Sequence, residues 1–134
     1  LGMSPSWQVV ATARSPASAG MRTLDVTCRE SVVHTIEEFR PDVVFHLAAT
    51  FCDDFGQAYA TNVLGASNLL AGIEAVDNKP RLVLMGSAAE YGFVCADENP
   101  ITERQLLRPM TTYGLTKAWQ TQLGVRLWRE EGDA

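Results

Sequence analysis

Hydrophobic and polar positions follow two different periods along the chain, one typical of strands and one typical of helices. Residues 7–14 (WQVVATAR) and 22–26 (RTLDV) are rich in β-forming residues and flank a turn-like stretch at 15–20, which predicts two strands. Residues 42–48 (DVVFHLA) are almost continuously apolar, as in a parallel strand buried on both faces. Residues 81–86 are a further apolar run, so the pattern predicts four strands.

Three segments carry apolar residues at helical spacing. The first follows Thr27, which can cap a helix with Glu30 three residues later, and it ends at Pro41. The second covers residues 57–76, and the third covers residues 112–131. Strands and helices therefore alternate in the order β-β-α-β-α-β-loop-α. This order predicts an α/β protein with a partial doubly wound parallel sheet in three layers, α/β/α.

Length and composition narrow the class of protein. The 134 residues suffice for one domain, and 46% hydrophobic with 20% charged residues is typical of a soluble globular chain. Eleven basic residues are scattered among sixteen acidic ones, which disfavours nucleic acid or an anionic membrane as a partner. The apolar runs are too short to span a bilayer and the N-terminus does not look like a signal peptide, so we expect a cytoplasmic protein. Cys28, Cys52 and Cys95 form no Cys-x-x-Cys pair, which predicts reduced thiols and no metal site.

Tyr113 and Lys117 stand four residues apart in the last predicted helix, which places them on one face of it. An ammonium beside a phenol stabilises the phenolate, so this spacing suits acid–base catalysis. Ser87 follows the strand at 81–86 and begins a long loop at 87–109, at the sheet edge where open α/β folds bind ligands. A hydroxyl there could bind the substrate oxygen that Tyr113 protonates; the simpler alternative is a loop serine that caps a turn.

Six pieces of sequence, in this order, resemble the extended short-chain dehydrogenase/reductase family of NAD(P)-dependent sugar epimerases, dehydratases and reductases, over residues 7–129. They are residues 24–26 (LDV), 41–49 (PDVVFHLAA), 62–70 (NVLGASNLL), 86–92 (GSAAEYG), 100–103 (PITE) and 113–117 (YGLTK). The resemblance implies a Rossmann-type domain. The GSAAEYG string looks most like the 4-keto-sugar reductases, such as the GDP-4-keto-6-deoxy-mannose reductases.

The resemblance implies catalytic roles. It makes Ser87, Tyr113 and Lys117 the catalytic triad, with Tyr113 as acid/base and Lys117 also holding the nicotinamide ribose. Glu90 is expected to touch the sugar, or to be a charged loop residue. His46, inside a buried strand, is expected to be a hydrogen-bonded core histidine rather than a catalytic one.

The resemblance also implies cofactor contacts. Asp25 and Val26 would meet the adenine, and Ala48 and Ala49 would pass behind the cofactor. Asn62 matches the helix asparagine that lines the site, or it is a buried asparagine satisfied by backbone groups.

Two departures from the family pattern are informative. Family members that prefer NAD end the second strand on an acidic residue, where this chain has Ala13 followed by Arg14. A guanidinium suits a 2′-phosphate, so we expect NADP in preference to NAD. The dehydratases carry an Asp-Glu pair where this chain has Ala88 and Ala89, so dehydration is not expected.

No Gly-x-x-Gly-x-x-Gly phosphate loop precedes Trp7, and the chain ends after the Tyr–Lys helix. We therefore expect residues 1–134 to be the middle part of an NAD(P)-binding domain, without the C-terminal substrate domain. The strand that would stand between residues 7–14 and 42–48 is missing, and a gap there would leave two backbone edges unpaired. Either residues 7–14 slide across to pair with residues 42–48, which we favour, or another chain supplies the strand in an oligomer.

The pattern as a whole predicts an NADP-dependent oxidoreductase that reduces the 4-keto group of a nucleotide-activated sugar. Two alternatives stay open: a sugar 4-epimerase of the same family, and a catalytically silent structural or interaction domain derived from it. Because the groove beside the missing strand would be damaged, we expect the 134 residues alone to bind NADPH weakly or not at all.

Overall fold

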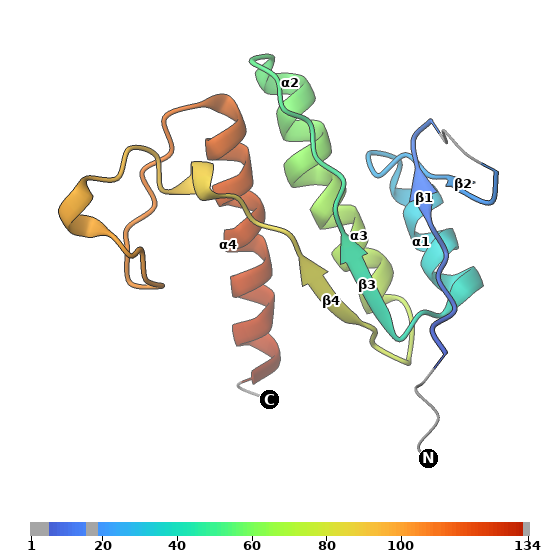
Figure 1. Ribbon diagram of the computed structural model, residues 1–134. Coiled ribbons are helices and arrows are strands. Elements are labelled where there is room, and N and C mark those ends of the chain that lie inside the picture. The colour runs from blue at the N-terminus through green and yellow to red at the C-terminus, as the bar shows by residue number, and fades with distance from the viewer. Residues whose placement is uncertain (1–5, 16–18, 133–134) are drawn as a thin grey trace.

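The computed structural model describes residues 6–15 and 19–132, with side chains up to residue 127. Four short strands are present: β1 (Thr12–Ala13), β2 (Arg22–Thr23), β3 (Val43–His46) and β4 (Arg81–Leu84). The helices are α1 (Arg29–Phe39), α2 (Phe55–Ala58), the π-helix η1 (Tyr59–Leu64), α3 (Gly65–Glu74), the 3-10 turns η2 (Ala88–Glu90) and η3 (Ala96–Glu98), and α4 (Thr112–Gly132). Figure 1 shows their arrangement.

The predicted order of elements is confirmed, but several bounds differ. Only two of the residues at 7–14 are in a strand, and the expected turn includes residues 16–18, which lie outside the described residues. The prediction that Thr27 caps the first helix is wrong: Cys28 is the N-cap, without a side-chain capping bond, and Thr27 bonds Asp25 instead. The helix expected at 57–76 is present as α2, η1 and α3.

The strands form two separate parallel pairs, β1 with β2 and β3 with β4. The prediction that residues 7–14 slide across to pair with residues 42–48 is therefore wrong, because in the described residues no ladder joins β1 to β3. The physical reason is helix packing. Helix α1, which connects β2 to β3, packs against α3, so closely that a Cβ on Gly72 would lie 3.1 Å from Ile36 Cγ1. This contact is consistent with the separation of the two strand pairs, and among the described residues no strand pairs with the facing edges of β1 and β3.

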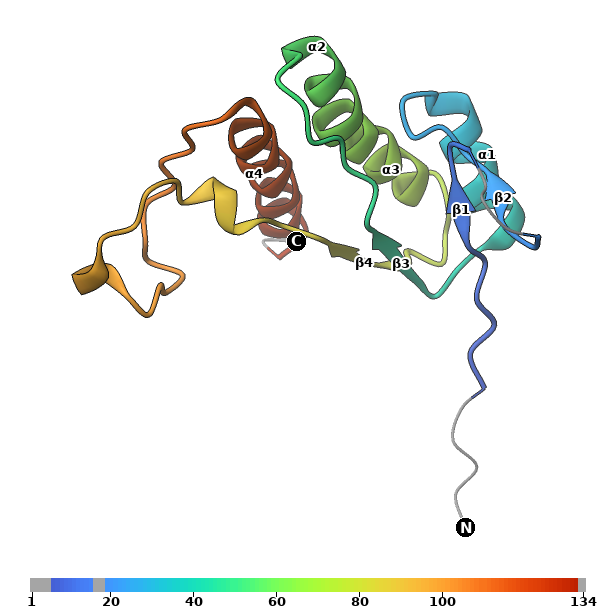
Figure 2. The ribbon, with the colours of Figure 1, turned by 45° about the horizontal axis from the view of Figure 1, so that its top comes forward.

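The hydrophobic core lies between α1, α3 and the strands. Its buried members are Val32, Ile36, Leu69 and Val76, against which Leu24, Val44, Ile73 and Leu82 pack. Val44 and Leu82 are register partners on β3 and β4, so the face of this pair that carries them is the one that the helices cover (Figure 2).

The expectation that residues 42–48 are buried on both faces is wrong. Phe45 of β3 is 61% exposed and Leu47 is 65% exposed, whereas His46 between them is 5% exposed. Successive strand side chains point to opposite faces, so one face is covered by helices and the other is open. The described residues form one helical layer over β3 and β4, and they do not supply the second layer of the expected α/β/α arrangement.

Three aromatic rings attach α4 to the preceding helices. Phe55 stacks on Tyr59 with ring centroids 5.8 Å apart, and both rings are nearly perpendicular to that of Trp119, with centroids 6.0 and 6.1 Å away. Such pairs stabilise packing beyond the area that they bury. They fix α4 beside α2 and η1, and thereby set the position of the residues at its N-terminal end.

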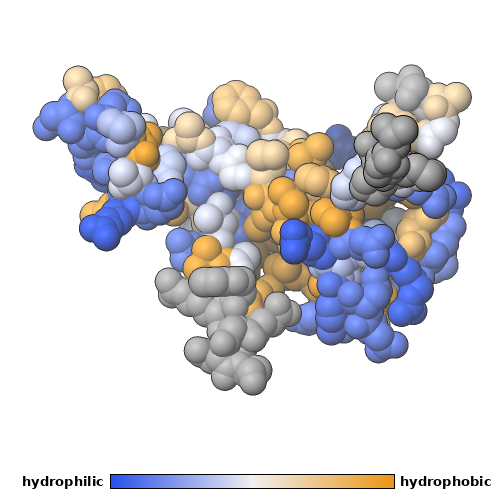
Figure 3. Space-filling view, turned by 60° about the horizontal axis from the view of Figure 1, so that its bottom comes forward, coloured by the Kyte–Doolittle hydropathy of each residue, from blue (hydrophilic) through white to orange (hydrophobic). Residues whose placement is uncertain are grey.

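A groove of about 850 Å³ lies between α3, α4 and the N-terminal ends of β3 and β4. Its lining is largely apolar and includes Val43, Leu70 and Val125. Figure 3, in which the bottom of Figure 1 comes forward, shows hydrophobic surface gathered in the middle of the molecule. The groove is at the opposite end of the strands from Ser87. None of the helices in the described residues is long and apolar enough to cross a membrane.

Candidate active site

The end of β4 and the start of α4 meet at one place. Ser87 follows β4 and is the N-cap of η2, and Tyr113 is in the first turn of α4. Gly114 permits the contact between these elements, because a Cβ at this position would lie 2.5 Å from the carbonyl oxygen of Ala89. The structure thus brings the two predicted parts of the triad, 26 residues apart in the sequence, to one edge of the sheet.

Ser87 and Glu90 form a capping box around η2. The Ala89 amide donates to Ser87 Oγ at 3.2 Å, and the Ser87 amide donates to Glu90 Oε1 at 2.7 Å. The turn-capping alternative for Ser87 therefore applies. It does not compete with a role toward substrate, because Oγ accepts in this bond and keeps its own proton to donate.

Contact between Glu90 and the sugar stays a prediction, and the structure gives the Glu90 carboxylate another partner. Glu90 is 4% exposed, and its carboxylate faces inward to the amide of Ser87. Its backbone oxygen accepts from the Arg108 amide at 3.0 Å, which joins η2 to the end of the long loop. Glu90 is thus a residue that shapes the loop that carries Ser87.

Tyr113 is half-buried, and its ring meets Phe51 edge-on with centroids 5.0 Å apart. In the described part of the chain no hydrogen bond joins the Tyr113 hydroxyl to Ser87 or to Lys117. Its hydroxyl therefore has no protein partner within the triad and is available to a ligand.

Lys117 lies one turn further along α4 and is 2% exposed. Its Nζ donates to the carbonyl oxygen of Met85, two residues before Ser87, and to Gln120 Oε1 at 2.8 Å. Burial lowers the pKa of Lys117, and the charge of Glu90 acts in the opposite direction. The ammonium is thus attached to the end of β4.

His46, at the end of β3, is the core histidine that was expected, but it is not fully hydrogen-bonded. It is 5% exposed, and its Nε2 has no hydrogen-bond partner among the described residues. Burial, and then the charge of Lys117, lower the pKa of His46 to about 4. His46 is therefore neutral at physiological pH and adds no charge beside Lys117.

Asn62 is fully buried in the π-helix η1, and its side chain connects three segments. Oδ1 accepts from the Thr50 amide at 2.8 Å, and Nδ2 donates to the Thr50 carbonyl at 3.1 Å and to Thr116 Oγ1 at 2.9 Å. The alternative of a buried asparagine satisfied by backbone groups fits these bonds, because both amide protons are used by the protein. Asn62 fixes the loop after β3 against α4, and its side chain is not open to a cofactor.

The residues expected at the adenine and at the 2′-phosphate follow β2 and β1 respectively. The Leu24 amide donates to the Ala13 carbonyl at 2.9 Å, so Arg14 and Asp25 follow neighbouring strands. The pKa of Asp25 is lowered, chiefly by the hydrogen bond from the Thr27 amide, then by the Thr27 hydroxyl, with a smaller effect of the Arg14 charge. Arg14 is exposed.

The residues that could hold a dinucleotide follow strands of both pairs. Arg14 offers an exposed cation after β1, and Tyr113 and Ser87 offer hydroxyls near the end of β4. Between them, Ala48 and Ala49 follow β3 and are exposed, and their methyl groups leave the backbone open to close approach. Val26 is held against α3, because Asn68 Nδ2 donates to its carbonyl at 3.0 Å.

Sequence reasoning missed three polar residues that connect elements, two of them buried. Gln120 and Thr116 are both 0% exposed on α4, and Asn68 ties the chain after β2 to α3. A signal was present in the sequence: Thr116 and Gln120 interrupt the apolar pattern of the last helix beside Lys117. Buried polar side chains need hydrogen-bond partners, so such interruptions point to a polar network.

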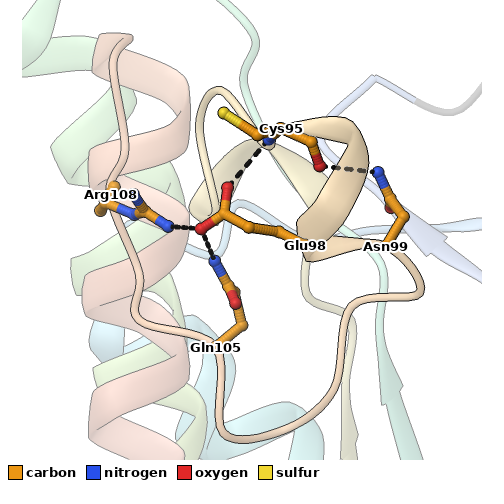
Figure 4. A network of polar contacts seen from close by, with 5 residues as sticks. All are labelled: Cys95, Glu98, Asn99, Gln105 and Arg108. Atoms are coloured by element: carbon orange, nitrogen blue, oxygen red, sulfur yellow. Dashed lines mark hydrogen bonds and ion pairs between the residues drawn. The ribbon is translucent and has the colours of Figure 1, made fainter.

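The long loop is held together by Glu98 (Figure 4). Its carboxylate accepts from the Cys95 amide and Gln105 Nε2, each at 2.8 Å, and from Arg108 Nη2. These three donors, in that order of effect, lower the pKa of Glu98 to about 2. The Arg108 amide also donates to the Glu90 carbonyl, so this network joins the loop to η2, the turn that Ser87 caps.

Comparison with known proteins places the chain in a family. A model of the NAD dependent epimerase/dehydratase family matches residues 3–133, and the chain belongs to this family. The resemblance that the motifs indicate is thus confirmed.

A UDP-glucose 4-epimerase of Mycoplasma genitalium is 32% identical over 102 residues, which are 69% of this chain and 29% of that protein. The structure of RMD from Pseudomonas aeruginosa complexed with NADPH matches with a TM-score of 0.74 and 26% identity, over 83% of this chain and 38% of that one. The Bordetella bronchiseptica enzyme WbmG, in complex with NAD and UDP, matches with a TM-score of 0.67 and 28% identity, over 80% of this chain and 35% of that one. The α/β fold class is confirmed. The chain spans about a third of the length of these relatives.

Proposed function

We propose that the chain is the catalytic part of an NADP-dependent oxidoreductase that reduces the 4-keto group of a nucleotide-activated sugar. The observation that carries the proposal is the contact between the segment of Ser87 and the start of α4. The backbone of Gly114, next to Tyr113, packs against Ala89, and Lys117 bonds the carbonyl of Met85. All three residue types that the proposed chemistry needs are at the carboxyl end of β4, where α/β sheets bind ligands.

Each residue of this triad has a separable task. Tyr113 gives its phenolic proton to the carbonyl oxygen of the sugar, and Ser87 orients that oxygen by donating a hydrogen bond to it. The positive charge of Lys117, one turn away on α4, stabilises the phenolate that is left on Tyr113. The nicotinamide, when bound, supplies the hydride.

Arg14 supports NADP as the cofactor. It is exposed at the end of β1, beside the neutral Ala13, and a guanidinium pairs well with a 2′-phosphate. RMD from Pseudomonas aeruginosa is complexed with NADPH, whereas WbmG is complexed with NAD, so both cofactors occur among the relatives.

The residues of η2 support reduction rather than dehydration. Ala88 and Ala89 directly follow Ser87 and carry no group that could transfer a proton. A nucleotide-activated sugar as substrate is supported by the UDP in the WbmG structure. A 4-epimerase is the second candidate, favoured by the 32% identity to the Mycoplasma genitalium UDP-glucose 4-epimerase.

A chimera tests this proposal. Residues 7–131 replace the matching segment of RMD from Pseudomonas aeruginosa, which supplies the parts that this chain does not cover. It is offered NADPH with GDP-, UDP- and dTDP-linked 4-keto sugars, and separately NAD with UDP-glucose. Consumption of NADPH with a keto sugar supports reduction. Conversion of UDP-glucose to UDP-galactose without net reduction of NAD supports the epimerase. If neither reaction occurs, the silent domain is supported.

Two expectations about the surroundings of the chain stay predictions. A cytoplasmic location suits an enzyme whose substrate is a nucleotide sugar. Self-association through the open edges of β1 and β3 would pair the backbone groups exposed there. Sedimentation of the 134-residue chain measures this self-association directly.

A further inference from the structure

Gln120 and Lys117 form a closed triangle of hydrogen bonds with the backbone of Met85. Lys117 Nζ donates to the Met85 carbonyl and to Gln120 Oε1, and Gln120 Nε2 donates to the same Met85 carbonyl at 2.9 Å. Gln120 is 0% exposed and Lys117 is 2% exposed, so both side chains of the triangle are buried, whereas Met85 is 51% exposed.

The triangle fixes the orientation of both side chains. A glutamine amide has one acceptor oxygen and one NH₂ group, and because the NH₂ group points at Met85, the oxygen must point at Nζ. An ammonium has three N–H donors, and two of them are used here. The third is left for a group outside the triangle.

We propose that Gln120 is a positioning residue, which holds the Lys117 ammonium at the end of β4 without adding a charge to it. The proposal rests on the proposed function, because it assigns a role within that site. A neutral partner matters here because Met85 is two residues before Ser87 and Lys117 is one turn after Tyr113. The triangle therefore couples the position of the ammonium to that of both other members of the triad.

The charges around Lys117 decide what a substitution would do. Glu90 on η2 is the carboxylate that acts on Lys117, His46 on β3 is neutral, and Tyr113 is on the same helix as Lys117. Gln120→Glu would place a second carboxylate directly against Nζ at nearly unchanged shape. Because an opposite charge favours the charged form, this substitution should raise the pKa of Lys117.

The chain is well suited to a direct measurement, because Lys79 and Lys117 are its only two lysines. Lys79 is exposed and serves as an internal reference. In the 134-residue chain labelled with ¹³C at lysine Cε, two signals are followed by NMR as the pH is raised, and Lys79→Arg assigns them. We expect the Lys117 signal to titrate below the ordinary range of a lysine, and Gln120→Glu to move its midpoint up by about one pH unit.

Gln122→Glu is the matched control, because it adds the same charge to the same helix at an exposed position two residues further on. We expect it to leave the Lys117 midpoint unchanged. Equal shifts in Gln120→Glu and Gln122→Glu, or no shift in either, would overturn the proposal.

A second measurement uses the wild-type chain and therefore does not depend on the folding of a variant. In the wild-type chain, nuclear Overhauser contacts between the Lys117 ε-methylene and the Gln120 amide protons are expected, and their absence would equally overturn the proposal. Neither measurement needs cofactor or substrate. A failure here would therefore reject the role of Gln120, whereas the keto-reduction assay of the chimera tests the function itself.

Discussion

The backbone of Gly114 packs against the carbonyl oxygen of Ala89, at a distance that leaves no room for a side chain. Gly114→Ala would put a Cβ 2.5 Å from that oxygen, and backbone on both sides cannot move aside cheaply. We expect the free energy of unfolding to fall by about 1–3 kcal/mol, measured by urea denaturation. Gly124→Ala, in the same helix, is the control. Its Cβ would meet only the end of the flexible Leu84 side chain, so a change within about 1 kcal/mol is expected.

Asn62 holds the loop after β3 against α4, so its removal should loosen both. Asn62→Ala leaves the Thr50 amide and carbonyl without their buried partner, and we expect the free energy of unfolding to fall by about 3 kcal/mol. Asn78→Ala, an exposed asparagine that bonds the Pro41 carbonyl, should cost about 1 kcal/mol or less. Equal losses in the two variants would contradict the role given to Asn62.

Glu98 makes the stability of the long loop depend on pH. Its folded pKa of about 2 is below the ordinary value of 4.5, so its contribution is complete above pH 4.5 and is lost as the pH falls through about 2. As the pH is lowered from 4.5 to about 2, the free energy of unfolding of Glu98→Gln should fall less than that of the wild type. Urea denaturation at several pH values measures this difference. Glu103→Gln, an exposed residue of the same loop, should follow the wild type. If Glu98→Gln keeps the full wild-type slope, the network does not act as described.

Arg14 and Ala13 are expected to select the cofactor. In the chimera, NADPH should bind more tightly than NADH, because the Arg14 guanidinium pairs with the 2′-phosphate and Ala13 offers nothing to a ribose diol. Ala13→Asp should reverse this order, since a carboxylate binds the diol and repels the phosphate. Fluorescence titration with both cofactors measures it. Equal affinities in the unmodified chimera would defeat the assignment.

The features that the sequence predicted well are local ones. The helix with Tyr113 and Lys117, and the order of strands and helices, follow from residue spacing within one segment. The capping role of Glu90 could be predicted from the sequence, because Ser87-Ala88-Ala89-Glu90 is the spacing of a capping box. The same is true of Thr27, since a Thr two residues after Asp25 favours a local side-chain turn over a helix cap.

The features that sequence reasoning missed depend on contacts between distant segments. The residues at 7–14 have strand propensity along their whole length, but a ladder needs a partner, and only Thr12 and Ala13 have one in β2. The exposure of Phe45 depends on which helices cover that face of the sheet, and the sequence of residues 42–48 does not determine which helices these are. The triangle of Gln120, Lys117 and Met85 joins residues 35 positions apart.

The proton donor is the central claim, and one substitution tests it most directly. In the chimera, Tyr113→Phe removes only the phenolic hydroxyl, so we expect kcat for keto-sugar reduction to fall by about 10²–10⁴-fold while the Kd for NADPH is nearly unchanged. Tyr59→Phe, which removes a hydroxyl from the aromatic cluster away from Ser87, should keep the full rate. A Tyr113→Phe chimera that reduces the keto sugar at the rate of its parent would contradict the account.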